Sequence, residues 1–182
     1  TDGGNDAVWA PNGLTIVFDR RTAGDDALYE IPFFGGRRKL IKQDAISADF
    51  SPDGKYLVFQ QPSDGSLRIM PLIGKGKDTI IANFGEHPVW SPDGNWIAFQ
   101  MDGDIWKVKI NASGRPMGDP IQITSSPFWD GMPTWTADSQ SIIYHTGLER
   151  DYDLWKVSAD SGMPVWLTGA PEFGDYDPSV SK

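Results

Sequence analysis

The sequence has 182 residues, with 16 Lys or Arg against 25 Asp or Glu, so its formal net charge at pH 7 is −9. This acidic excess argues against nucleic acid as a partner. The absence of cysteine excludes disulfides, thiolate metal sites and cysteine nucleophiles. No stretch approaches the roughly 18 apolar residues that a membrane-spanning helix needs, so we expect no membrane insertion. Residues 1–6 show no signal-peptide pattern and read as a processed or excised start.

A short motif recurs four times: an aromatic residue, a small residue and a tight turn of the Pro-Asp-Gly type. The aromatic residues follow one another at intervals of 41, 40 and 45 residues, a period typical of repeat architectures. Proline presets φ, Asp or Asn bonds nearby amides and glycine accepts positive φ, so the motif predicts a hairpin turn. The motif residues are Trp9, Pro11 and Gly13; Phe50, Pro52, Asp53 and Gly54; Trp90, Pro92, Asp93 and Gly94; and Trp135 and Asp138.

Each repeat contains four short segments with strand character, separated by turn signals. In chain order we expect strands at 7–9, 15–18, 28–31 and 39–41, then at 48–50, 56–59, 67–70 and 79–81. The third and fourth repeats predict strands at 88–90, 96–99, 105–108 and 121–123, then at 133–135, 141–144, 154–157 and 165–167. No helical periodicity longer than a turn is present, so we expect an all-β protein.

The second strand of each repeat is a nearly continuous apolar run, as in 56–59 and 96–99. A strand with one solvent-exposed face would alternate apolar and polar residues, so these continuous runs indicate that both faces of the strand are buried against neighbouring sheets. The third strand alternates more and the fourth is least apolar, which suits a blade whose first strands lie near a central axis. We therefore predict a β-propeller of four-stranded antiparallel blades at about 7–42, 46–83, 88–124 and 133–168, with 178–182 beginning a fifth.

The best copy of the repeat runs from Pro88 to Val108, with Trp-Ser-Pro-Asp-Gly followed by an apolar strand and Asp-Ile-Trp-Lys-Val. This pattern resembles the repeat of the TolB-type β-propellers, and the resemblance covers essentially the whole chain. The last copy departs from it, with Ala137 and Ser139 at the proline and glycine positions. The resemblance implies a structural repeat unit of a longer ring, and it is compatible with a periplasmic or secreted parent.

Four blades could close alone, remain open, or pair with a second copy into an eight-bladed ring. An open arc would expose two large apolar blade faces, so we expect closure or oligomerisation, most simply a homodimer that completes a larger propeller.

The loops that join one blade to the next collect on one face of a propeller, where binding usually resides. In this chain they pair acidic residues with aromatic ones, a combination that suits a protein or peptide partner. The alternative is that the aromatics cap the blade packing and the carboxylates bond loop amides. The candidate residues are Phe84, Glu86, His87, Phe128, Trp129, Asp130, Phe173, Asp175, Tyr176 and Asp177.

Other chemistry is weakly represented. Glu86 with His87, or Asp175 with Asp177, are the pairs considered for a cation, but no calcium-loop spacing occurs and we assign no metal site and no cofactor. Neither a Gly-x-Ser-x-Gly elbow nor a His-Glu-x-x-His motif is present, so we assign no catalytic residue. The one basic cluster, at 35–39, reads as a solvated hairpin rather than a nucleic-acid patch.

The leading hypothesis is a non-enzymatic propeller that binds a protein or peptide through its loop face. The resemblance also leaves open a second function, because propellers of this type form the gating domain of prolyl-oligopeptidase-like and tricorn-like peptidases. A third possibility is a purely structural repeat unit that assembles into a larger ring.

Overall fold

The structure is a computed structural model that describes residues 6–21, 25–74, 76–148, 151–160 and 162–168. These residues form four antiparallel sheets of four strands each, and within each sheet the strands are hydrogen-bonded in sequence order. The described part of the chain contains no helix, and thus none long and apolar enough to cross a bilayer. The all-β prediction and the four-stranded antiparallel blades are therefore confirmed.

Each sheet corresponds to one repeat and is called a blade. Blade 1 comprises β1 (Ala7–Trp9), β2 (Thr15–Arg20), β3 (Ala27–Pro32) and β4 (Lys39–Gln43). Blade 2 comprises β5 (Ile46–Phe50), β6 (Tyr56–Gln60), β7 (Leu67–Pro71) and β8 (Thr79–Ala82). Blade 3 comprises β9 (Glu86–Trp90), β10 (Trp96–Met101), β11 (Asp104–Lys109) and β12 (Ile121–Gln122). Blade 4 comprises β13 (Trp129–Trp135), β14 (Ser141–Leu148), β15 (Asp151–Ser158) and β16 (Val165–Trp166).

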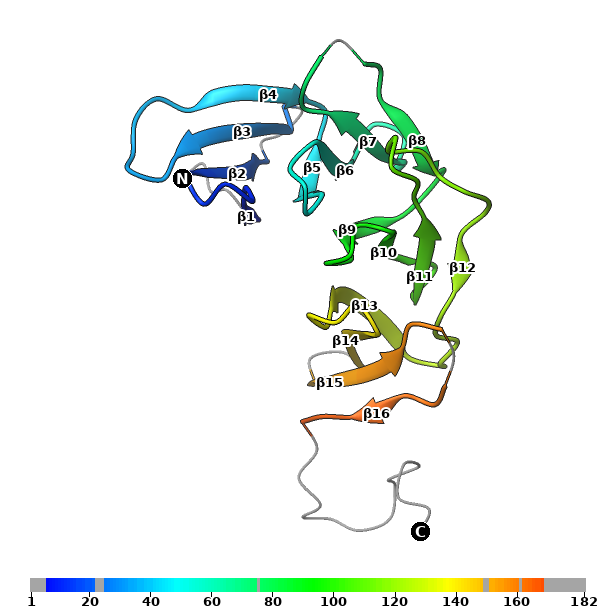
Figure 1. Ribbon diagram of the computed structural model, residues 1–182. Helices are drawn as coiled ribbons and strands as arrows, with labels where there is room; N and C mark the ends of the chain where they lie inside the picture. The colour runs from blue at the N-terminus through cyan, green and yellow to red at the C-terminus, as the bar shows by residue number, and fades with distance from the viewer. Residues whose placement is uncertain (1–5, 22–24, 75, 149–150, 161, 169–182) are drawn as a thin grey trace.

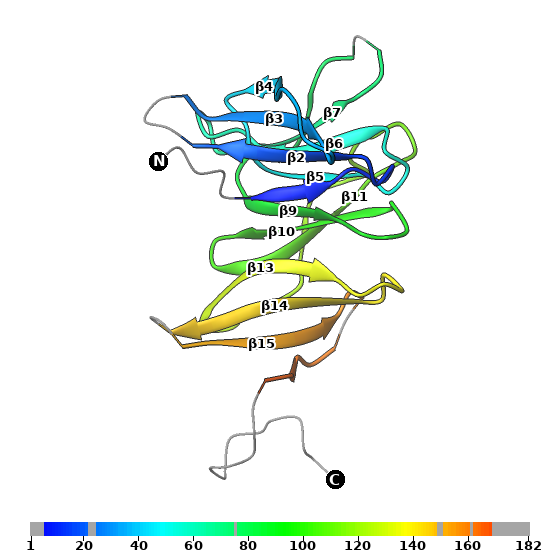
Figure 2. The same cartoon turned by 90° about the vertical axis from the view of Figure 1, so that its left-hand side faces the viewer.

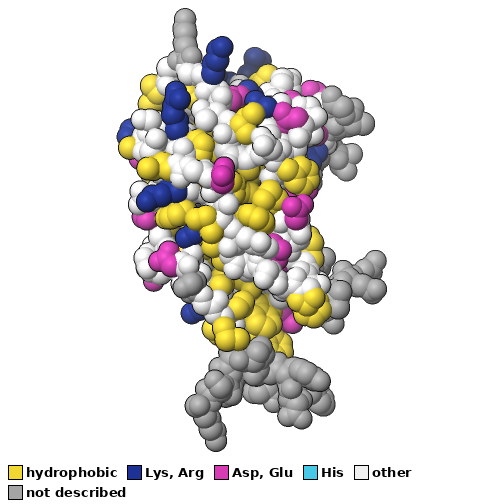
Figure 3. All heavy atoms as spheres, turned by 90° about the vertical axis from the view of Figure 1, so that its right-hand side faces the viewer, with side chains coloured by type: hydrophobic (Ala, Val, Ile, Leu, Met, Phe, Trp, Pro, Cys, Tyr) yellow, Lys and Arg dark blue, Asp and Glu magenta, His cyan; other side chains and the backbone are white. Residues whose placement is uncertain are grey.

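The blades fan around an axis as an open arc (Figure 1). The first strands β1, β5, β9 and β13 lie on the concave inner side, where each contacts the first strand of the next blade. Figure 2 looks onto this inner side, and the motif turns lie at one end of the first strands. The fourth strands form the convex rim, where apolar, basic and acidic side chains are mixed (Figure 3). Of the alternatives stated above, the described residues adopt the open arrangement.

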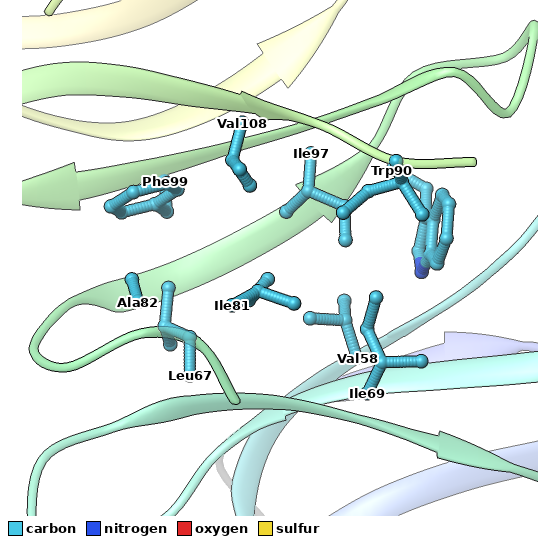
Figure 4. Close-up of a cluster of buried hydrophobic side chains, with 10 residues drawn as sticks. Val58, Leu67, Ile69, Ile81, Ala82, Trp90, Ile97, Phe99 and Val108 are labelled. Carbon is cyan, nitrogen blue, oxygen red and sulfur yellow. The ribbon is translucent and has the colours of Figure 1, made fainter. Parts of the chain in front are cut away.

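The core lies between adjacent blades rather than inside any one of them. One cluster fills the space between blades 2 and 3, where Val58 and Ile69 lie toward Ile97, and Leu67 and Ala82 lie toward Phe99 (Figure 4). Comparable clusters join blade 1 to blade 2 and blade 3 to blade 4. The middle strands β6 and β10 are buried along their central residues, because a neighbouring blade covers each face. This is the packing that the continuous apolar runs predicted.

The motif aromatic shows the same dependence on a neighbour. Trp90 packs against the preceding blade and is 6% exposed, and Trp135 is 9% exposed in the same setting. Trp9 occupies the equivalent position in blade 1, where the described residues include no preceding blade, and it is 50% exposed. Its ring meets Phe33 instead, with the ring centroids 4.9 Å apart. One end of the arc therefore presents the apolar face that other blades bury.

The motif turns are held by a repeated side-chain network. The Ser91 hydroxyl donates to Asp93 Oδ1 at 2.5 Å and accepts from the Trp96 amide at 2.9 Å. Ser51 with Asp53 and Thr136 with Asp138 repeat this arrangement in blades 2 and 4. Ser139, at the glycine position of the last copy, adopts the positive φ of 61° that the turn requires. The turn thus forms there without glycine, and the strand pattern around it is kept.

The predicted start of the first strand needs correction in three blades, and in blade 2 β5 begins at Ile46 rather than at residue 48. β9 begins at Glu86 rather than at residue 88, and β13 begins at Trp129 rather than at residue 133. The sequence-based boundaries stop at Pro88 and Pro133, but a β-bulge at each proline lets the strand continue toward its N-terminal end. Glu86, His87, Trp129 and Asp130 therefore lie in first strands and not in connecting loops.

Candidate functional site

The four first strands present equivalent residues around the axis. The position three residues before the motif aromatic is Asp6 in blade 1, Ser47 in blade 2, His87 in blade 3 and Met132 in blade 4. All four line one hollow of about 250 Å³ on the inner side of the arc. The rest of its lining comes from the same strands: Val8, Ala48, Asp49, Pro88, Val89 and Pro133. We call these ten residues the axial hollow.

A backbone irregularity places three of these side chains. Ser47, His87 and Met132 have φ values of 47°, 50° and 51°, which non-glycine residues rarely adopt. Each lies where the register between first and second strand shifts, between Ile46 and Asp49 in β5 and at the corresponding points of β9 and β13. Strain of this kind costs on the order of 1 kcal/mol or more per residue and clusters at functional sites. The same bulge thus carries a different side chain in each blade.

A polar network fills the blade 1 side of the axial hollow. The Arg21 guanidinium donates from Nε to Asp19 Oδ2 at 2.9 Å and from Nη2 to Ser47 Oγ at 3.0 Å. Its Nη2 also lies 3.3 Å from Asp6 Oδ2, to which the Ser47 hydroxyl donates at 3.1 Å. Asp19 is fully buried and accepts a further bond from the Asp6 amide at 2.9 Å. Four side chains from two blades are therefore fixed by one another.

Asp49 forms a second fixed element of the axial hollow. Its carboxylate accepts from the Trp90 amide at 2.7 Å and from the Phe50 amide at 2.9 Å, which ties the first strands of blades 2 and 3 together. Burial raises the pKa of Asp49 to about 6, while the two amide bonds favour the ionised form. The carboxyl therefore titrates close to neutral pH.

Two of the predicted aromatic residues, Phe84 and Trp129, lie outside the axial hollow and pack on hairpins. Phe84 covers Gly65, because a Cβ at that glycine would lie 2.8 Å from the Phe84 ring. Trp129 covers the Gly103 turn of blade 3 in the same way, with a ring atom 4.0 Å from the position of a Cβ. Both keep exposed surface, 51% for Phe84 and 38% for Trp129, and Phe128 is also exposed. The aromatics thus cap the blades and still present apolar surface.

The other predicted residues divide into three groups. His87 is brought into the axial hollow, whereas Glu86, beside it in β9, is not part of its lining. Asp130 was expected on an exposed loop face, but it is 1% exposed because it points into the interface with blade 3. Phe173, Asp175, Tyr176, Asp177 and the predicted start of a fifth blade at 178–182 lie outside the described residues.

Several residues of the axial hollow were missed by sequence reasoning. Asp6, Ser47, Asp49 and Met132 carry no motif, but three of them share a fixed offset from the motif aromatic. That offset was the available signal, and it becomes informative only once the bulge is known. Among the described residues, no three His, Asp or Glu side chains gather as metal ligands. The axial hollow therefore brings together an imidazole, two carboxyl groups, a hydroxyl and a thioether.

No family model matches the chain. Two curated proteins resemble it in sequence. The chain is 27% identical over 174 residues to the uncharacterized protein Atu1656 of Agrobacterium fabrum, covering 90% of this chain and 57% of that protein. It is 28% identical over 152 residues to the uncharacterized peptidase YuxL of Bacillus subtilis, covering 72% of this chain and 23% of that protein. The chain thus spans 57% of the length of the first of these relatives and 23% of the second.

Solved structures show the same fold at lower identity. A putative TolB from Agrobacterium tumefaciens aligns with a TM-score of 0.73 and 22% identity, over 89% of this chain and 64% of that chain. TolB from Acinetobacter baumannii aligns with a TM-score of 0.74 and 20% identity, over 91% and 43%. A puromycin-hydrolyzing peptidase of Mycobacterium tuberculosis aligns with a TM-score of 0.65 and 15% identity, over 92% and 31%. The chain therefore has a TolB-like β-propeller fold.

Proposed function

We propose that this TolB-like propeller arc is a non-enzymatic scaffold that binds a protein or peptide segment at the axial hollow and its aromatic rim. The observation that carries the proposal is a repeated geometry with varied chemistry: a strained bulge presents a hydroxyl, an imidazole and a thioether from blades 2, 3 and 4, and Asp6 adds a carboxylate at the same offset in blade 1. A bulge that served only the fold would not need a different side chain in each blade. Binding residues are often held on a rigid scaffold in this way.

The chemistry of the hollow suits an extended peptide. His87 offers a hydrogen-bond donor, Asp6 and Asp49 offer acceptors, and Met132 is exposed and adapts its shape to an apolar side chain. Phe128 and Trp129 add exposed aromatic surface of the kind that dominates binding energy at interfaces. The net charge of −9 favours a neutral or basic segment.

A randomised 12-residue peptide phage library, panned against the immobilised chain, tests this proposal. We expect clones whose synthetic peptides lose at least tenfold in affinity for the double variant His87→Ala/Met132→Ala. The matched control is Lys55→Ala, in the motif turn at the other end of the first strands, which should bind like the wild-type chain. Peptides that bind both variants equally well, or a library that yields none, would contradict an axial binding site.

A second candidate function is the propeller part of a peptidase. The similarity to YuxL over 72% of this chain, and to the propeller-containing region of a puromycin-hydrolyzing peptidase, supports it. In that case the reacting groups would come from elsewhere in the parent protein, and the axial hollow would contact the peptide before cleavage. Assay of the parent protein against acyl-peptide and aminoacyl substrates distinguishes the two functions, because a scaffold predicts no hydrolysis above the rate of a catalytically inert propeller.

A further inference from the structure

A buried carboxylate at the interface of blades 3 and 4 has no hydrogen-bond partner. Asp130 is 1% exposed, and neither of its carboxylate oxygens has a hydrogen-bond partner. Its backbone is well fixed, because its amide donates to the Gly103 carbonyl at 2.8 Å. Burying a polar group without a partner is unfavourable, and burying a charged one is far more so. The carboxylate therefore requires either a proton or a ligand.

Two further oxygen atoms without partners lie on the strands beside it. Thr146 is directly opposite Asp130 in the β13–β14 ladder, so the two side chains share a face, and Thr146 Oγ1 is buried and unpaired. Gln100 Oε1, from β10 of blade 3, is also buried and unpaired. A Cβ at Gly131 would lie 2.5 Å from this oxygen, so the absence of a side chain at the residue next to Asp130 leaves the space that the Gln100 oxygen occupies.

The other two charged residues that are less than 9% exposed, Asp19 and Lys107, each pair with an opposite charge, which sets Asp130 apart. Asp19 is as deeply buried, but it pairs with Arg21 at 2.9 Å and accepts from the Asp6 amide. Lys107 is buried as well, and it meets Asp160 at 3.4 Å and the ring of Trp96 at 3.9 Å. For Asp130, no cationic side chain of the described residues acts on the carboxyl.

The electrostatic surroundings of Asp130 are negative. Burial raises its pKa, the Thr146, Thr124 and Ser126 hydroxyls oppose that rise, and the nearby Asp104 carboxylate adds to it. The Thr124 hydroxyl is already directed at Asp104 Oδ1 at 3.3 Å, so its proton is not free for Asp130. Burial, followed by the charges of Asp130 and Asp104, also raises the pKa of Tyr144. The pocket thus offers acceptors and negative charge and lacks positive charge.

We propose that Asp130, Gln100 and Thr146 form a binding site for a hard cation, most naturally Ca²⁺, between blades 3 and 4. The three side chains supply four oxygen atoms: two from the carboxylate, one from the amide and one from the hydroxyl. Ca²⁺ takes six to eight oxygen ligands in a flexible geometry, with water completing the shell, whereas Mg²⁺ demands a nearly ideal octahedron. The nearby Asp104 carboxylate adds negative charge that would offset the second charge of the ion.

This site would revise the expectation that no metal is bound, which considered only the pairs Glu86–His87 and Asp175–Asp177. The equivalent position in blade 3 shows why the site is local. Gly85 stands where Asp130 stands in blade 4, five residues before the motif aromatic, and a Cβ there would lie 2.8 Å from Leu67 and 2.9 Å from Phe99. Apolar side chains fill that interface, so it has no room for an acid at this position.

Terbium luminescence and thermal unfolding test the site directly. Tb³⁺ substitutes for Ca²⁺, and Trp129, adjacent to Asp130, would sensitise its emission on excitation of the indole. We expect saturable emission from the chain that Ca²⁺ displaces, and a rise in Tm of roughly 5 °C at a Ca²⁺ concentration a hundred times the dissociation constant. The variant Asp130→Asn should lose both responses by at least tenfold in affinity, whereas Asp138→Asn, in a motif turn, should keep them.

A second variant keeps the test valid if Asp130→Asn fails to fold. Thr146→Val preserves the shape of the side chain and removes only the hydroxyl, so it should fold and bind Tb³⁺ several-fold more weakly. Absence of displaceable emission from the wild-type chain at millimolar Ca²⁺, or equal responses from the wild type and Asp130→Asn, would overturn the proposal. The latter outcome would leave a protonated carboxyl or a buried water as the explanation of Asp130.

Discussion

The Trp90 amide donates a 2.7 Å hydrogen bond to the Asp49 carboxylate, joining the first strands of two adjacent blades at the edge of the axial hollow. The donor belongs to blade 3 and the acceptor to blade 2, so this bond exists only when the two blades are packed together. The same two residues thus link the packing of the arc to the electrostatics of the candidate site, since Trp90 also belongs to the core between blades 2 and 3.

The stability of the chain should report the titration of Asp49. Burial raises the pKa of this carboxyl from 3.8 to about 6, so between these values the folded chain binds more protons than the unfolded chain. The free energy of unfolding therefore falls as the pH rises from about 4 to about 6, and then levels off. Urea unfolding of the wild type and Asp49→Asn across this range checks the sign. The difference between the two curves should change with pH, and parallel curves would contradict the assignment.

Trp90 and Trp9 form a natural pair for measuring what a neighbouring blade contributes. Trp90→Ala removes a ring from a packed core and should lower the free energy of unfolding by about 3–5 kcal/mol. Trp9→Ala, at the same repeat position but half exposed, should cost about 1 kcal/mol. Chemical denaturation of both variants gives the comparison. Equal costs would show that blade-to-blade packing is not the main stabilising contact of the motif aromatic.

The motif hydroxyl should matter for stability at an exposed turn. Ser91→Ala removes the side-chain acceptor of the Trp96 amide and one donor to the Asp93 carboxylate, which keeps its two bonds from Asn95, so we expect a loss of about 1–2 kcal/mol in the free energy of unfolding. Ser113→Ala is the matched control, because Ser113 lies in an exposed turn and bonds Asn111 Oδ1 through its backbone amide, which alanine keeps. If the two alanine variants unfold at the same urea concentration, the network has no stabilising role.

Arg21 should be required for the stability of the fold because it neutralises the buried carboxylate of Asp19. Arg21→Ala removes the guanidinium that lies 2.9 Å from that buried carboxylate, and we expect a loss of about 2 kcal/mol or more in the free energy of unfolding. The exposed pair of Lys39 and Glu30, 2.8 Å apart, offers the contrast, because Lys39→Ala should change stability little. Thermal unfolding at low and high salt distinguishes them, and an Arg21 variant as stable as the Lys39 variant would be inconsistent with a buried ion pair.

The blade architecture could be predicted because its cause is visible locally. Phe59 and Phe99 sit in continuous apolar runs, and both are fully buried between blades. The motif turns were equally accessible, since their proline, aspartate and glycine each meet a specific backbone need. These features depend on short segments of sequence, and such segments recur in each of the four repeats.

The candidate site was less accessible because it depends on contacts between blades. Nothing in the sequence next to Ser47, His87 or Met132 marks a positive φ, and a following alanine or proline reads as the start of a strand. The burial of Asp130 likewise depends on Gln100 and Gly103 of the preceding blade. Its acidic side chain beside aromatic residues was therefore interpreted as an exposed loop.

Hydrogen exchange with a panned peptide bound is the most direct measurement of the central claim, that partners bind at the axial hollow. The account predicts slowed exchange of amides in residues 44–49, 84–89 and 128–133, which carry the bulges and the aromatic rim, and unchanged exchange in the motif turns at 51–55 and 91–95. Protection confined to the motif turns or to the outer strands β8 and β12 would contradict it.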